Sequence, residues 1–430
     1  MNKILMLLFI LSVSVSAFSQ RILTLKECYE KAYVTAPVAG EKQAYSDIWK
    51  LKDKNLVKGW LPTLDANGSF VYNSSVVDMT DGLGSLPVPG IADHIQAMPH
   101  EQYRVTLDIN QVIYDGGAIK GARALEKADL NINKQQTEAD LYKLREQINR
   151  YYFNLLLIDR QKRLLQNYLE LLNKRMQSVN SALTSGVILK SDIDVLSSEK
   201  IKLEQQLMEN DIRKISLLKI LSDLTGIDID DSTQLVIPPA EQKLSDELAR
   251  PELQLFDLRT EQLDASRKLI QSKRMPRAFG FATLGYGNPP GSNFFKDEFA
   301  PYYMVGAGLK WNIFDWNKVK NEKQVLSLQQ SIIDSRKSDM TDNLKRLLDA
   351  KGAEIESLES MLKTDSALIE IRKRITLTAE SQYENGVITA TDYLNELNDE
   401  RQAKINYEIH TINLAMARVE YLNISGKEIE

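Results

Sequence analysis

The stretch QYRVTLDINQVIYDGG, residues 102–117, contains the two patterns that decide the fold of this chain. From Gln102 to Asn110 polar and apolar residues alternate, which is the period of a β-strand with two unlike faces. Two glycines then end the strand, and from Ala118 onward the apolar residues recur at helical spacing. The stretch therefore predicts a strand that passes directly into a helix. One face of the strand carries Tyr103, Val105, Leu107 and Ile109.

Three further segments alternate in the same way, at residues 62–73, 276–286 and 302–313. Each is close to the length of a tilted strand that crosses a membrane, about 9–11 residues. A soluble antiparallel sheet with one buried face would show the same alternation, so the strands alone leave both interpretations open. If the sheet lies in a membrane, the residues expected to face lipid are Leu64, Phe70, Tyr72, Val105, Leu107, Ile109, Leu284, Tyr286, Val305 and Leu309.

The chain repeats itself at a spacing of 200 residues. QVIYDGG at 111–117 aligns with WNIFDWN at 311–317, and SGVILKSD at 185–192 aligns with NGVITATD at 385–392. Several agreements at one spacing indicate an internal duplication. We expect a signal peptide over 1–19, a first structural repeat over 20–226, a linker over 227–250, a second repeat over 251–426 and a C-terminal tail over 427–430.

Each half is expected to hold one very long helix, over 118–184 and over 318–384. No proline occurs between Pro99 and Pro238, and none follows Pro301. At 1.5 Å per residue such a helix would be about 100 Å long. A compact globular core cannot support a helix of that length. We therefore expect coiled-coil-like packing beside other helices of similar length.

The N-terminus has the features of an export signal. Lys3 is followed by a short apolar run from Ile4, and the small residues Ala17 and Ser19 precede Gln20. The run is shorter than the roughly 20 residues that span a membrane. A signal peptide is therefore favoured over a membrane anchor.

Composition excludes further classes of protein. The formal net charge of -5 gives no reason to expect nucleic-acid binding, which usually needs a basic patch. The single cysteine, Cys28, cannot form an internal disulfide, and its sequence context suits a helix rather than a lipid anchor. We expect that helix to begin near Thr24, with Glu27 completing a capping box, and to end before Pro62.

Four strands per chain are too few to close a barrel. An open sheet edge in lipid leaves unpaired backbone groups, each costing several kcal/mol. A membrane sheet must therefore be shared among copies of the chain. Two copies would give eight strands, which side chains fill, whereas three give twelve and leave a lumen. A conduit favours three copies.

These features together resemble the TolC-like outer-membrane efflux protein family, over nearly the whole chain after the signal. The order and the duplication of short motifs carry the resemblance, rather than any one motif. The motifs are GWLPTL (59–64), YDGG (114–117), SGV (185–187) with Asp192, PEL (251–253), and NGV (385–387) with Asp392.

The resemblance implies an α+β membrane protein, internally duplicated, in which a long α-helical coiled-coil barrel joins a shared transmembrane β-barrel of four strands per chain and twelve in a trimer. It implies a homotrimer in the cell outer membrane, in contact with outer-membrane lipid, with the helical part in the periplasm. The partners would be a periplasmic membrane-fusion adaptor protein and an inner-membrane transporter. The adaptor-docking tips would lie at Gly186, Val187, Gly386 and Val387.

The resemblance also implies a periplasmic gate. By motif alignment Asp192, Tyr383 and Asp392 match gate positions. The chain departs from the family where Ile388 stands at a site that can be basic, and where Asn395 replaces a second acid of the constriction. A different interpretation stays open, because Asp192 and Asp392 follow turns and could simply stabilise helix starts.

The sequence contains no arrangement typical of an enzyme. His94 and His100 lie in the loop between the first two strands, where solvation is favoured over metal binding. We expect no catalytic residue, cofactor or metal. The alternative to an efflux or secretion channel is a periplasmic or surface coiled-coil structural protein without a pore.

Overall fold

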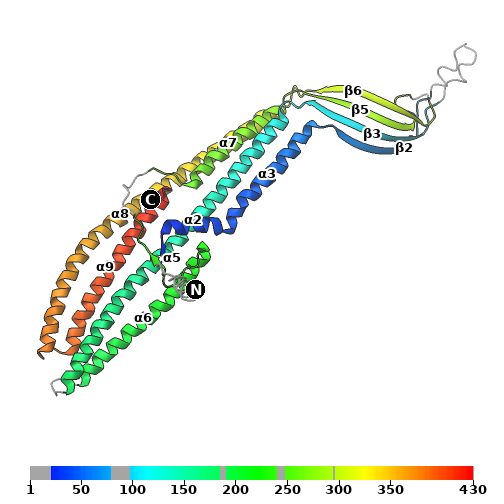
Figure 1. The fold of residues 1–430 in the computed structure, drawn as a ribbon. Coiled ribbons are helices and arrows are strands. Elements are labelled where there is room, and N and C mark those ends of the chain that lie inside the picture. The colour runs from blue at the N-terminus through cyan, green and yellow to red at the C-terminus, as the bar shows by residue number, and fades with distance from the viewer. Residues whose placement is uncertain (1–20, 79–96, 185–189, 240–246, 294–295, 430) are drawn as a thin grey trace, which may run out of the picture. The chain divides into compact units, whose positions relative to one another are not determined.

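The computed structural model describes residues 21–78, 97–184, 190–239, 247–293 and 296–429 (Figure 1). The expected signal peptide and the expected tip at Gly186 and Val187 lie outside the described residues. The chain forms two compact units. We call them the sheet unit, Lys42–Gln135 with Gln254–Lys337, and the helical unit, Met1–Glu41 with Gln136–Leu253 and Ser338–Glu430.

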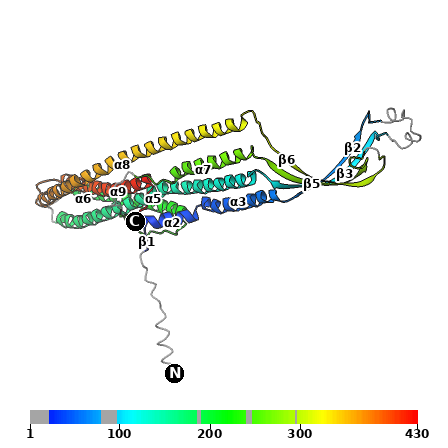
Figure 2. The same ribbon diagram turned by 90° about the horizontal axis from the view of Figure 1, so that it is seen from above.

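The sheet unit contains one sheet of four strands in the order β2-β3-β5-β6, and every neighbouring pair is antiparallel (Figures 1 and 2). All four strands expected from alternation are therefore confirmed, each within three residues at either end. Their bounds are Thr63–Tyr72 for β2, Glu101–Tyr114 for β3, Arg277–Asn288 for β5 and Ala300–Lys310 for β6.

Next to the sheet, helix α3 (Glu41–Val57) and helix α7 (Pro251–Ser272) pack against the first part of helix α5 (Ala118–Thr184) in the same unit. The Arg123 guanidinium donates to both carboxylate oxygens of Asp53, at 2.6 and 3.0 Å. A Cβ placed on Gly121 would lie 3.1 Å from the Leu269 Cα. The glycine in the first turn of α5 thus leaves room for the backbone of α7.

The long helices α5 (Ala118–Thr184) and α8 (Lys318–Glu384) have 67 residues each, as the sequence predicted. Each is followed in the chain by a helix of 36 residues, α6 (Lys190–Thr225) and α9 (Ala390–Ser425). The bounds of both pairs are 200 residues apart, which is the spacing seen in the sequence motifs. Within the helical unit, α8 and α9 form a helical hairpin, as α5 and α6 do (Figures 1 and 2).

The expected first helix is broken, and that part of the prediction was wrong. Helix α2 (Leu25–Thr35) ends at Ala36, and a short 3-10 turn, η1 (Pro37–Gly40), precedes α3. Ala36 has an extended ψ of 129°, because a residue before proline is pushed out of the helical region. Half of the expected capping box is present, since the Thr24 hydroxyl accepts a hydrogen bond from the Glu27 amide at 3.2 Å. The Glu27 carboxylate instead pairs with Arg21 at 3.4 Å.

A core of the helical unit joins α2 to the middle of α5 and the ends of α6 and α9. Cys28 is buried there, which confirms that it is a helix residue. A two-stranded parallel sheet, β1 (Ile22–Leu23) with β4 (Gln234–Leu235), borders the same core and was not expected. Two residues per strand are too few for a pattern to reveal.

Among the described residues, no helix combines the length and the apolar content needed to cross a membrane.

Tyr152 fastens β1 and β4 to α5. Its ring is fully buried, and its hydroxyl lies 2.9 Å from the Leu23 carbonyl and 2.7 Å from the Val236 carbonyl, while accepting from the Val236 amide at 3.1 Å.

Tyr152→Phe should lower the free energy of unfolding by about 1–3 kcal/mol, because buried backbone groups lose their partner. Urea unfolding followed by circular dichroism measures this. The matched control is Tyr151→Phe, which should change stability by less than about 0.5 kcal/mol; equal effects would contradict the assignment.

Candidate functional site

The residues expected to face lipid share one face of the sheet, which we call the apolar face. Strand register places Leu64 beside Ile109, Ile109 beside Ala282, and Ala282 beside Val305. The next row joins Leu107 to Leu284, and Leu284 to Tyr303. Most of these side chains are exposed, with Val305 74% exposed, whereas Ile109 is half-buried. Among the described residues of the sheet unit, no helix or second sheet covers this face.

Both edges of the sheet are open as well. Strands β2 and β6 form the two ends of the strand order, and neither pairs with a further strand among the described residues. Because all three strand pairs are antiparallel, β2 and β6 run in opposite directions. A β2 strand placed against the β6 strand of another copy would therefore form one more antiparallel pair.

The turn between α8 and α9 is a tight one with a left-handed glycine. Gly386 has φ +70°, and the Val387 amide donates to the Gln382 carbonyl at 2.8 Å. Val387 is 68% exposed at this turn. Gly386 is therefore required by backbone geometry whatever the turn binds.

Asp392 caps the start of α9. The Asp392 amide donates to the Thr389 hydroxyl at 3.2 Å, and the Asp392 carboxylate accepts from the Thr389 amide at 3.1 Å. This is a capping box. The hydrogen bonds from Thr389 hold the pKa of the Asp392 carboxyl below its usual range. The interpretation as a helix-start residue is thus supported for Asp392.

Tyr383 lies inside the helical unit rather than on its surface. It is 8% exposed, and its ring stacks on that of Tyr393 with centroids 5.5 Å apart. Its hydroxyl has no hydrogen-bond partner among the described residues. Burial raises the pKa of Tyr383, and the nearby Asp192 carboxylate raises it further.

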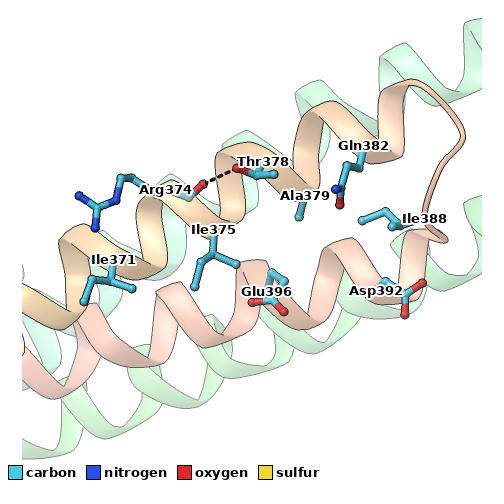
Figure 3. A pocket seen from close by; sticks show the side chains of 9 residues that line it. All are labelled: Ile371, Arg374, Ile375, Thr378, Ala379, Gln382, Ile388, Asp392 and Glu396. Atoms are coloured by element: carbon cyan, nitrogen blue, oxygen red, sulfur yellow. Dashed lines mark hydrogen bonds between the residues drawn. The ribbon is translucent and has the colours of Figure 1, made fainter.

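The other expected gate residues lie elsewhere. Asp392 borders a groove of about 480 Å³ between α8 and α9, whose floor is apolar (Figure 3). Ile388 contributes to that floor, and Glu396 lies one helical turn beyond Asp392 on the same rim (Figure 3). Asn395 is exposed on α9. The groove has the apolar side chains Ile371, Ile375, Ala379 and Ile388.

Sequence analysis missed Arg175, which links three helices. Its side chain is only 9% exposed on α5, yet it pairs with Glu380 and Glu384 of α8. Its guanidinium also lies 5.5 Å from the centroid of the Tyr393 ring of α9. The available signal was spacing, because Arg175 lies three residues after the buried Leu172 and four before the buried Val179.

With this geometry in view, comparison with known proteins is informative. Residues 57–197 match the family model of the outer membrane efflux protein. This match lies within the first half of the chain, and the fold of the chain is TolC-like. The matched segment includes β2, β3, all of α5 and the start of α6. A search of curated protein sequences found no match.

Solved structures extend the likeness to the rest of the chain. CusC, studied for transmembrane channel formation, has a TM-score of 0.67 at 13% identity, covering 94% of this chain and 92% of that one. VceC, an outer membrane protein of Vibrio cholerae, gives 0.66 at 12% identity, with 94% and 97% covered. The MtrE outer membrane channel of Neisseria gonorrhoeae gives 0.64 at 15% identity, with 94% and 89% covered. At these identities the likeness establishes the outer membrane efflux protein fold over both halves.

The Arg175 contacts predict a clamp between α5 and α8. Arg175→Gln should speed amide hydrogen exchange in the last two turns of α8 by about fivefold. An ion pair with partly exposed acids contributes about 1 kcal/mol. Lys174→Gln is the matched control, because Lys174 is exposed and pairs with Glu170 of its own helix at 2.8 Å. Unchanged exchange in Arg175→Gln, measured by mass spectrometry, would contradict the clamp.

Proposed function

We propose that this chain is the outer-membrane channel component of a multipartite efflux or secretion system, and that it acts as a passive exit duct rather than an enzyme. The observation that carries the proposal is the single-layered sheet, whose apolar face is uncovered and whose two edges are open. In water such a sheet would expose a large apolar patch and two rows of unpaired backbone groups. In a membrane, lipid covers the face and neighbouring copies pair the edges.

Three copies of the chain would both pair all sheet edges and leave an open lumen. Joining β6 of one copy to β2 of the next gives twelve antiparallel strands, enough to leave a lumen. Helix α6 supports association in the helical unit, because Ile201, Met208, Ile212 and Ile215 are more than half exposed and recur at helical spacing. Neighbouring copies in a homotrimer would cover this stripe, and the helices would form the wall of the duct.

The location and the partners follow from this arrangement. The strands lie in the outer membrane, and the helical part lies in the periplasm. The turns at Gly186 with Val187 and Gly386 with Val387 are the docking tips for a periplasmic adaptor protein, which connects the duct to an inner-membrane transporter. The exposed Val387 supports this role, since an apolar side chain at a turn suits a protein contact.

The periplasmic entrance is the second part of the proposal. Asp192, Tyr383, Asp392 and Asn395 form its constriction, and Arg175 holds α5 to α8 behind it. Even one acid per copy would give a ring of three carboxylates, which favours cations over anions. The alternative function, a structural coiled coil without a pore, would leave the apolar face of the sheet unexplained.

The membrane position of the apolar face is tested with adjacent residues of β6. Val305→Arg should abolish assembly in outer membranes, because a cation on the lipid face costs about 2–4 kcal/mol near the midplane. Met304→Arg is the matched control, since residue 304 lies on the opposite face and should still assemble. Membrane fractionation and cross-linking to trimers report the result. A wild-type monomer that stays in solution without detergent would rule out the channel.

The role of Asp392 is tested by separating its charge from its cap. Asp392→Asn removes the charge and keeps an acceptor oxygen, whereas Thr389→Ala removes the capping hydroxyl and keeps the charge. If Asp392 belongs to the constriction, Asp392→Asn should lower the cation preference of the channel in planar bilayers by about twofold or more, and Thr389→Ala should not. The same preference in all three proteins would leave Asp392 with the capping role alone.

A further inference from the structure

The face of the sheet opposite the apolar face carries aromatic rings laid over glycines. Register pairs Phe279 with Gly308 and Phe281 with Gly306 across strands β5 and β6. A Cβ built on either glycine would overlap the ring opposite it. Each phenylalanine therefore leans across β6 and lies over its backbone, which only glycine permits. Both rings are half-buried in this position.

Two carboxylates follow in the next row of the same face. Asp65 of β2 pairs with Asp108 of β3, and Asp108 pairs with Thr283, two residues beyond Phe281 on β5. Two residues along a strand correspond to about 7 Å. The acidic row and the aromatic rows are thus adjacent on one surface, which we call the acid–aromatic band: Asp65, Asp108, Phe279 and Phe281.

The Asp108 carboxylate is fixed by neutral groups rather than by a cation. It accepts hydrogen bonds from the Thr283 hydroxyl at 2.6 Å, the Asn67 amide at 2.8 Å and the Thr106 hydroxyl at 2.9 Å. In the described part of the chain, no ion pair involves Asp108 or Asp65. Two carboxylates therefore lie at paired positions without a positive charge between them, and like charges directly opposite each other destabilise a strand pair.

We propose that the acid–aromatic band is a contact surface for amphiphilic aromatic cations passing through the lumen, which makes such cations a cargo class of the duct. The proposal rests on the proposed function, because only a barrel with its apolar face in lipid turns this band inward. The aromatic rings would take the apolar body of the cargo, and the row of carboxylates would take its charge. The distance of one row between the aromatic and the acidic side chains matches a cargo molecule whose charged group is joined to an aromatic ring by a short linker.

The sign of the charge follows from two contributions that agree. The faces of aromatic rings attract cations and repel anions, and the adjacent carboxylates do the same. The same sheet face also carries three basic residues. Arg277 and Lys310 lie at the strand ends, two rows from Phe281. Arg104 lies at the other side of the band, two rows from Asp108. The rows between these cations hold the aromatic and acidic side chains, so a bound cation would lie away from all three.

The test uses the full-length channel in planar bilayers with three water-soluble probes. Benzyltrimethylammonium has a ring and a positive charge, tetramethylammonium has only the charge, and benzenesulfonate has a ring and a negative charge. We expect benzyltrimethylammonium to block the current at a concentration at least about fivefold lower than either other probe. Both Phe281→Leu, which keeps an apolar side chain, and Asp108→Asn should raise the blocking concentration by about threefold to tenfold.

The matched control is Leu284→Ala, on the apolar face of the same strand, which should leave the block unchanged. All variants should conduct normally without probe, which shows that they assemble. Equal block by the three probes, or equal block of all variants, would overturn the band while leaving the channel intact. Absence of any trimer conductance in the wild type would instead overturn the proposed function, and the band with it.

Discussion

The rest of the structure depends on one constraint, namely that a sheet with an apolar face must have that face and its edges covered. In this chain strands β2, β3, β5 and β6 form one layer, and no other described element of the sheet unit covers the row from Leu64 to Val305. In the proposed channel, lipid would cover this face and other copies of the chain would pair the edges.

The helical unit has a different requirement. It must hold its long helices together although few residues in each turn face a core. It does so with a buried core near α2 and with polar links farther along. Arg175 is the clearest such link, since it joins α5 to two acids of α8 and to the Tyr393 ring. Links of this kind can open without unfolding a core, which would suit the proposed entrance.

Much of the fold was predictable because strands and helices each give a characteristic spacing of apolar residues along the sequence. Alternation located the strands, and the absence of proline with helical spacing gave the bounds of α5 and α8. Three features were not predictable from such patterns. The break at Pro37 was missed because the helical spacing continues on both sides of it. The β1–β4 pair is too short to show a period, and Arg175 looked like one more surface charge, because its acidic partners are more than 200 residues away in the chain.

The candidate entrance shows where motif alignment reaches its limit. Alignment placed Asp192, Tyr383 and Asp392 in one role, but the structure gives them different surroundings. Tyr383 is buried and stacks on Tyr393, whereas the carboxylate of Asp392 is bonded within the turn that starts α9. A carboxylate committed to a cap keeps its charge at neutral pH, because the hydrogen bonds that it accepts favour the ionised form. The same bonds that fix the helix start therefore also hold a negative charge in place, and capping and a role in the constriction are compatible in one residue.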